Sequence, residues 1–120
     1  LKHYLTRNER QNRAYAFNHE TPGAKLAILD VRRIAMAERL QMLEINLHTG
    51  RHHQIRCQLS TIGLPIRGDL KYGAPRSNPD GSICLHARHV EFVHPVSKQH
   101  ISITADYPSL GIWDIFRNEA

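Results

Sequence analysis

The fold is decided at residues 42–59, where the chain reads MLEINLHTGRHHQIRCQL. Residues 42–48 alternate apolar and polar side chains, which is the period-two pattern of a half-buried strand. Thr49 then offers an N-cap and Gly63 a C-cap, and between them apolar residues recur at helical spacing, at Ile55, Leu59 and Ile62. The stretch therefore predicts a strand, a tight turn, and a helix that buries this apolar stripe.

Strands are also predicted on both sides of this stretch. Residues 25–35 form an apolar, partly β-branched run that we expect to pair antiparallel with the strand at 42–48. Residues 89–93 and 100–104 alternate, and the polar residues 95–99 between them suit a hairpin turn. Residues 1–14 favour a short helix or a surface segment over a core strand, and the Pro- and Gly-rich residues 64–79 predict an ordered loop. We expect a mixed α+β fold, largely antiparallel sheet with one main helix.

The composition narrows the classes of protein to consider. The 120 residues suit one domain or a piece of one, and the net charge of +5 favours a polyanionic partner, with a merely basic soluble domain as the alternative. Two cysteines without close spacing argue against a disulfide framework and fit a reduced, cytoplasmic setting. No apolar run is long enough for a membrane helix. The chain begins at Leu1 rather than Met, so we expect a missing upstream segment.

Basic residues gather where the predicted helix starts, at Arg51, His52 and His53. Positive side chains at this end oppose the helix dipole, so a bound anion would offset their cost. The alternative is a set of solvated basic residues at a helix tip. Arg56 lies one turn further along, on the flank of the apolar stripe, where packing can hold its guanidinium.

Three blocks of this sequence make a family recognisable. TGRHHQIR at 49–56, GLPI at 63–66 and GDLKYG at 68–73 resemble the TGRxHQIR, GxPI and GDxxYG blocks of RluA-type pseudouridine synthases. LHA at 85–87 and FVHP at 92–95 resemble later elements of that family. The resemblance runs from about Lys25 to Pro108, and His52 stands where many relatives carry Thr or Ser.

This resemblance implies a cofactor-free isomerase that converts uridine in structured RNA, either rRNA or tRNA, to pseudouridine. In that family an Asp in an RLDxxTSG motif is the nucleophile, and the second Arg of TGRxHQIR, here Arg56, pairs with it. The expected RNA contacts are Arg51, His52, His53, Gln54, Lys71 and Tyr72. For Tyr72 a buried position that braces the loop is the alternative.

The nucleophile motif is absent from these residues. Asp occurs at positions 30, 69, 80, 106 and 114, and none follows Arg-Leu or precedes the expected Thr-Ser-Gly. We expect the nucleophile before Leu1, which makes residues 1–120 the C-terminal portion of a catalytic domain and inactive alone. Asp69 is expected to serve a turn or a cap. The rival interpretation is a non-catalytic RNA-binding protein that retains half of the fold.

No metal site is predicted. Cys84, His86 and His89 are close in sequence, but the chain lacks the paired close ligands of a closed zinc site. We therefore expect no metal and no cofactor. The sequence does not indicate an oligomeric state.

Overall fold

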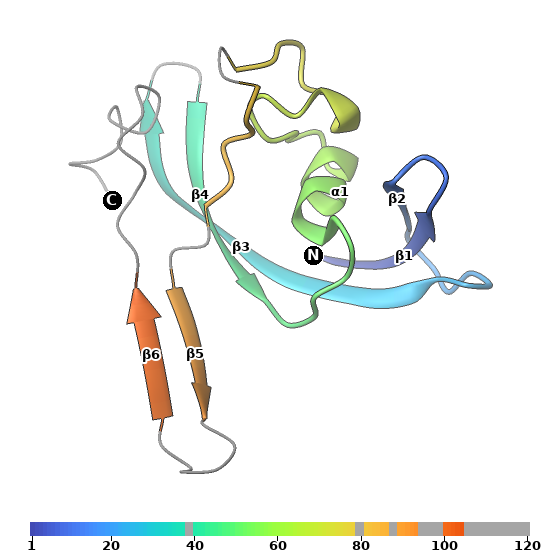
Figure 1. Cartoon of the computed structure of the whole chain (residues 1–120), viewed down its shortest axis with the longest axis horizontal. Coiled ribbons are helices and arrows are strands. Elements are labelled where there is room, and N and C mark those ends of the chain that lie inside the picture. Colours follow the sequence, from blue (N-terminus) through green and yellow to red (C-terminus); the bar gives the residue numbers. More distant parts are fainter. Residues whose placement is uncertain (38–39, 79–80, 87–88, 94–99, 105–120) are drawn as a thin grey trace. The chain divides into compact units, whose positions relative to one another are not determined.

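The structure, a computed structural model, describes residues 1–37, 40–78, 81–86, 89–93 and 100–104 (Figure 1). Its elements are β1 (Lys2–Asn8), β2 (Arg13–Phe17), β3 (Lys25–Ala37), β4 (Leu40–Leu47), α1 (Gln54–Thr61), a 3-10 turn (Leu70–Tyr72), β5 (His89–Val93) and β6 (His100–Thr104). Residues 1–33 and 43–84 form one compact unit, and this unit contains every residue of the candidate site. The remaining described residues belong to a second unit.

Strands β1 to β4 form one sheet in the order β2-β1-β3-β4. Strand β1 is antiparallel to both β2 and β3. Because β3 and β4 are joined by two residues only, they too are antiparallel, since a parallel pair needs a long crossover. The predicted mixed fold with an antiparallel sheet and one main helix is confirmed.

The predicted strands at the C-terminal side are confirmed as well. Strands β5 and β6 pair antiparallel, with His89 opposite Thr104 and Val93 opposite His100. The predicted turn at 95–99 lies outside the described residues.

The prediction for residues 1–14 was wrong, because this segment forms β1, a turn and the start of β2. Its buried side chains alternate along β1, at His3 and Leu5, and Ala14 is buried on β2. The Arg- and Asn-rich composition that suggested a surface segment comes largely from residues 7–12, the exposed end of β1 and the turn that follows it. The core cluster of this unit consists of Leu5, Ala14, Ala27, Cys57 and Tyr72.

The helix is present, but its start and its buried face differ from the prediction. The N-cap is His53, which has a left-handed backbone, and not Thr49. Thr49 instead accepts a hydrogen bond from the Ile28 N–H and donates to Gln54 Oε1, which ties the turn to β3.

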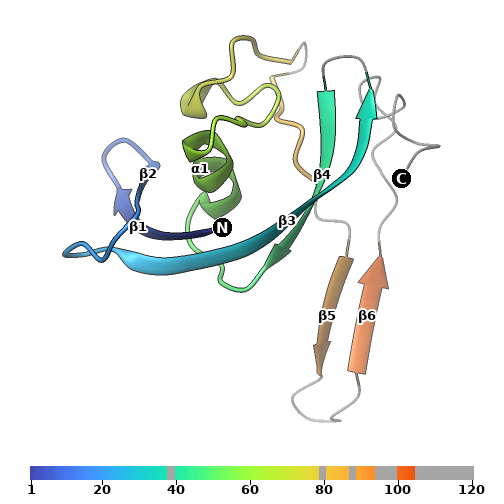
Figure 2. The same cartoon turned by 180° about the vertical axis from the view of Figure 1, so that it is seen from behind.

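The apolar stripe was wrong at its C-terminal end, since Ile62 is 42% exposed. The buried residues of α1 are instead Gln54, Cys57, Gln58 and Leu59. Helix α1 lies against the sheet in both views (Figures 1 and 2), and Gln58 Nε2 donates to the Ala27 carbonyl and contacts His3 Nδ1. The buried face of α1 is therefore rotated from the predicted apolar stripe toward Gln54 and Gln58, whose amides find polar partners on β1 and β3.

No helix in the described part of the chain is long and apolar enough to cross a membrane.

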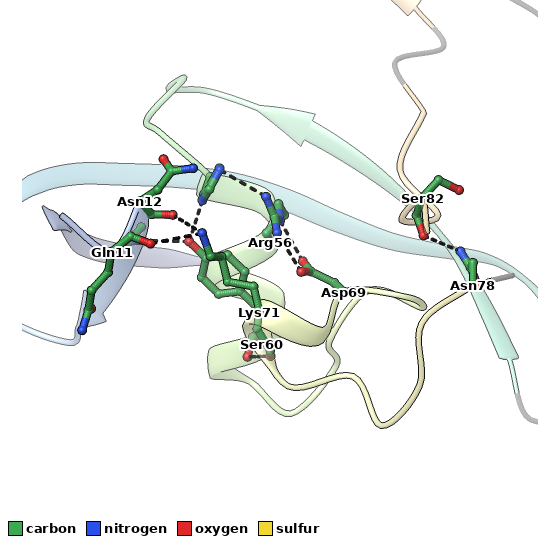
Figure 3. Close-up of polar contacts among 11 residues, drawn as sticks. Gln11, Asn12, Arg56, Ser60, Asp69, Lys71, Asn78 and Ser82 are labelled. Atoms are coloured by element: carbon green, nitrogen blue, oxygen red, sulfur yellow. Dashed lines mark hydrogen bonds and ion pairs between the residues drawn. The ribbon is translucent and has the colours of Figure 1, made fainter. Parts of the chain in front are cut away.

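Gly68 gives the first testable prediction. Its φ is +88°, and a Cβ there would lie 2.6 Å from the Ser82 carbonyl oxygen and 2.7 Å from Asn78 Nδ2, an amide that already donates to Ser82 (Figure 3). Gly23 is the matched control, because its φ of +79° is similar but its Cβ would meet nothing within 4 Å.

We expect Gly23→Ala to lower the free energy of unfolding by about 1–2 kcal/mol, the cost of a left-handed alanine. Gly68→Ala should cost clearly more, because the steric clash adds to the same backbone cost. Urea unfolding of both variants measures the difference. Equal losses of unfolding free energy would contradict the close packing of Gly68 against Asn78 and Ser82.

Candidate functional site

The centre of the candidate site is an ion pair between α1 and the loop that follows it. Arg56 donates through Nε to Asp69 Oδ2 and through Nη2 to Asp69 Oδ1, both at 2.8 Å (Figure 3). The Asp69 side chain is 1% exposed and that of Arg56 is 21% exposed. A carboxylate at this depth is expensive unless it is paired and hydrogen-bonded, and the planar guanidinium satisfies both of its oxygens.

The expected turn or capping role of Asp69 is confirmed for its backbone, because its carbonyl accepts from the Tyr72 N–H, but was wrong for its side chain. Asp69 does precede the 3-10 turn, but its side chain makes no capping hydrogen bond there. The carboxylate instead accepts two hydrogen bonds from Arg56. This contact is the main reason that the pKa of Arg56 is raised.

His53 lies on the other side of the same guanidinium. Its Nε2 is 3.1 Å from Arg56 Nη1, and its Nδ1 is 2.8 Å from the Tyr72 hydroxyl. Arg can only donate, so Nε2 must accept, and the proton of the neutral ring therefore sits on Nδ1. Burial and then the Arg56 charge are the leading causes that lower the pKa of His53 to about 4.

Tyr72 is buried, at 2% exposure, and its hydroxyl accepts a hydrogen bond from the Ala14 N–H at 2.8 Å. Its ring lies under two guanidinium groups, 4.9 Å from Arg56 Cζ and 5.0 Å from Arg13 Cζ. Burial raises the pKa of its hydroxyl. This geometry corresponds to the loop-bracing alternative, and the ring is not open for stacking on a base.

Gln54 is also buried, at 3% exposure. Its Oε1 accepts from the Arg51 N–H and from Thr49 Oγ1, while its Nε2 donates to the Ile28 carbonyl. Its side chain therefore holds the turn that carries Arg51, and its three hydrogen bonds are all made to groups of the same chain.

Arg51 and Lys71 are the two predicted RNA contacts with exposed side chains. Arg51 Nε donates to the Leu26 carbonyl. Lys71 Nζ donates to the carbonyls of Gln11 and Asn12 in the β1–β2 turn, at 3.1 and 2.8 Å (Figure 3).

His52 stacks on His53 with ring centroids 3.8 Å apart. Its pKa is lowered by loss of solvation and by the positive charges of Arg7, Lys71 and Arg56. The expectation that both histidines add positive charge at the helix start is therefore corrected. The positive field around His52 comes from those Arg and Lys side chains.

The sequence interpretation missed three residues of this arrangement: Asp69 as the partner of Arg56, Arg13 over Tyr72, and Arg7 near His52. Only Asp69 carried a signal, because it is the acidic residue of the GDLKYG block. Asp30 lies elsewhere on the unit, where its exposed carboxylate is 2.8 Å from His48 Nε2.

The candidate metal ligands are not brought together as a site among the residues that the structure describes. No group of three His, Cys, Asp or Glu side chains there could hold a metal ion. Cys84 Sγ instead accepts a hydrogen bond from Asn78 Nδ2 at 3.4 Å. The side chain of His89 lies outside the described part.

Comparison with known proteins gives a consistent result. A family model described as RNA pseudouridylate synthase matches residues 1–61. The uncharacterized RNA pseudouridine synthase YhcT of Bacillus subtilis is 37% identical over 91 residues, which cover 74% of this chain and 30% of that protein. Ribosomal large subunit pseudouridine synthase D of Zymomonas mobilis is 32% identical over 92 residues, covering 70% of this chain and 29% of that protein. The chain thus spans less than a third of the length of these two relatives.

The buried ion pair makes a prediction about stability. Arg56→Ala leaves the Asp69 carboxylate buried without its partner, which should lower the free energy of unfolding by about 3–5 kcal/mol. Adding Asp69→Asn removes the buried charge, so the double variant should be more stable than Arg56→Ala alone. Denaturant unfolding of wild type, Arg56→Ala, Asp69→Asn and the double variant checks this, and a double variant that loses the sum of both single effects would contradict it.

His53 makes a prediction about pH. Its pKa is about 4 in the folded chain against 6.5 ordinarily, so the unfolded chain binds more protons between these values. The stability that depends on neutral His53 is complete above pH 6.5 and is lost as the pH falls toward 4. His53→Asn keeps a residue that tolerates the left-handed backbone but does not titrate.

We expect wild type to lose more melting temperature than His53→Asn between about pH 7 and about pH 4.5. Thermal unfolding at both values measures this difference. Identical losses would mean that His53 is protonated as easily in the folded chain as in the unfolded one.

Proposed function

We propose a role for this chain that follows from its family. The chain belongs to the RluA-type RNA pseudouridylate synthases. In our proposal it supplies the arginine side of an active site that isomerises uridine to pseudouridine. The family and the names of the relatives support the reaction class. Structured rRNA or tRNA as the substrate, and the cytoplasm as the setting, are part of the proposal. The free cysteines Cys57 and Cys84 are compatible with a reduced compartment.

The main support for this proposal is the hydrogen bonding of the Arg56 guanidinium. Of its five N–H groups, one on Nε and one on Nη2 bind Asp69, and one on Nη1 faces His53. Among the residues that the structure describes, one N–H on Nη1 and one on Nη2 have no partner, and these can donate hydrogen bonds to a second carboxylate. A fixed guanidinium would keep that carboxylate ionised and would aim it at the substrate.

In our proposal the second carboxylate is the nucleophilic Asp of a segment outside these 120 residues. Of the two aspartates that the structure describes, Asp69 is buried on Arg56 and Asp30 pairs with His48 at the surface. Neither lies in the sequence context of the family nucleophile. Breaking the C–N glycosidic bond calls for such a nucleophile, so these residues alone should not turn over.

The exposed cations are the proposed RNA contacts. Within the described part of the chain, Lys71 Nζ donates two of its three N–H groups to carbonyls and Arg51 donates through Nε alone, so both keep N–H groups for phosphate oxygens. Lys71 and Arg7 provide positive charge close to His52. This charge would hold the RNA backbone while the target nucleotide is drawn out of its stack.

Arg56→Lys tests the catalytic part in the full-length gene product. Lys keeps the charge but loses the planar two-point contact, so the single-turnover rate of pseudouridine formation should fall about a hundredfold or more. Arg32→Lys is the control, because Arg32 also binds a carboxylate, Glu44, through a contact that is exposed on both sides.

The control should keep the wild-type rate. RNA binding without any turnover by wild type would favour the non-catalytic RNA-binding alternative. A wild-type rate in Arg56→Lys would show that this arginine is not part of the reaction.

The proposed RNA contacts predict that the affinity for RNA depends steeply on salt concentration. Neutralising phosphates with Lys and Arg releases counterions, so the affinity of the full-length product for structured RNA should fall as salt rises. Lys71→Ala should reduce the slope of log Kd against log salt by about 0.7–0.9, the share of one phosphate contact, whereas Lys25→Ala serves as an exposed control. An affinity that is equal at low and high salt would contradict RNA binding through these cations.

A further inference from the structure

The guanidinium of Arg56 is held on two sides by groups of its own chain. Asp69 covers the Nε and Nη2 side through two bonds of 2.8 Å, and His53 lies 3.1 Å from Nη1. A long side chain that would otherwise sample many rotamers is thereby restricted to one orientation. Among the described contacts of Arg56, one N–H on Nη1 and one on Nη2 are left free.

Asp69 is itself fixed by its backbone. Its N–H donates to the Ile66 carbonyl, and its carbonyl accepts from the N–H groups of Tyr72 and Ala74. The residue before it, Gly68, has no room for a Cβ. The carboxylate therefore has a defined place before Arg56 reaches it.

His53 is fixed in the complementary way. Arg56 Nη1 can only donate, so His53 Nε2 accepts from it and the ring proton lies on Nδ1. Nδ1 then donates to the Tyr72 hydroxyl at 2.8 Å, and the same hydroxyl accepts from the Ala14 N–H. The Asp69 carboxylate and the His53 ring thus both accept hydrogen bonds from one donor group.

We propose that Asp69 and His53 are positioning residues of the pseudouridine synthase reaction, which hold Arg56 so that two N–H groups point to the nucleophilic carboxylate. This inference rests on the proposed function. Asp69 is not the nucleophile, because both of its oxygens are bound to Arg56 and it is 1% exposed.

The Arg56–Asp69 pair also sets the net charge beside the proposed nucleophilic carboxylate. Arg56 and Asp69 together are neutral, so the nucleophile is aimed by two directed N–H groups more than it is attracted by net charge. Removing the Asp69 charge leaves Arg56 with its full positive charge, which should lower the pKa of a neighbouring carboxylate. The titratable groups that contact Arg56 are Asp69, His53 and Tyr72. The positive charge of Lys71 acts on His53 and on the His52 ring stacked against it, and that of Arg7 acts on His52.

The experiment compares Asp69→Asn, Asp69→Glu and the control Asp30→Asn in the full-length gene product. Single-turnover rates of pseudouridine formation are measured from about pH 5 to pH 9, together with the RNA Kd and the melting temperature. For Asp69→Asn we expect a rate loss of about ten- to hundredfold, an acid limb displaced to lower pH, and an RNA Kd within about twofold of wild type. Asp69→Glu should lose rate without moving the acid limb, and Asp30→Asn should match wild type.

Each result has one meaning. A wild-type rate and pH profile in Asp69→Asn overturns the positioning role while leaving the proposed function intact. If both Asp69 variants fail to fold, Asp69 is a structural residue and the inference is also overturned. Absence of pseudouridine formation by wild type contradicts the proposed function itself.

Discussion

The burial of the Asp69 carboxylate is the constraint on which the rest of this unit depends. A carboxylate that is 1% exposed must be matched by a cation at hydrogen-bonding distance, and Arg56 is the residue that meets it. The pair joins α1 to the loop after it, although the two residues are 13 positions apart in sequence. Because the same guanidinium also faces His53 and the ring of Tyr72, one interaction organises residues from the TGRHHQIR and GDLKYG blocks.

A second feature is the polar layer between α1 and the sheet. Gln54 and Gln58 are both buried, and their amides donate to the carbonyls of Ile28 and Ala27 on β3. Directed hydrogen bonds allow fewer relative placements of helix and sheet than an apolar contact does, because each donor must meet its acceptor. This directional contact suits a helix whose first turns must present Arg56 in one orientation.

The sequence predicted the features that rest on local patterns. An apolar, partly β-branched run was enough for the strand at 25–35, alternation for the strands at 42–48, 89–93 and 100–104, and helical spacing for the existence of α1. It failed where partners distant in sequence decide the outcome. Ile62 is exposed and Gln58 is buried because His3 and Ala27, far earlier in the chain, supply hydrogen-bond partners. For the same reason Arg56 could be singled out by its motif, whereas its partner Asp69 and the neutral state of His53 could not.

The attachment of Lys71 to the β1–β2 turn has a consequence for how this protein can change over evolutionary time. Exposed turns usually accept insertions and deletions freely. This turn supplies the Gln11 and Asn12 carbonyls to a lysine two positions after Asp69, so a change in its length would pull on the loop that holds the buried carboxylate. Natural variants of this chain should therefore keep the length of this turn even where its side chains drift, and length variation should accumulate in hairpins that make no such bond.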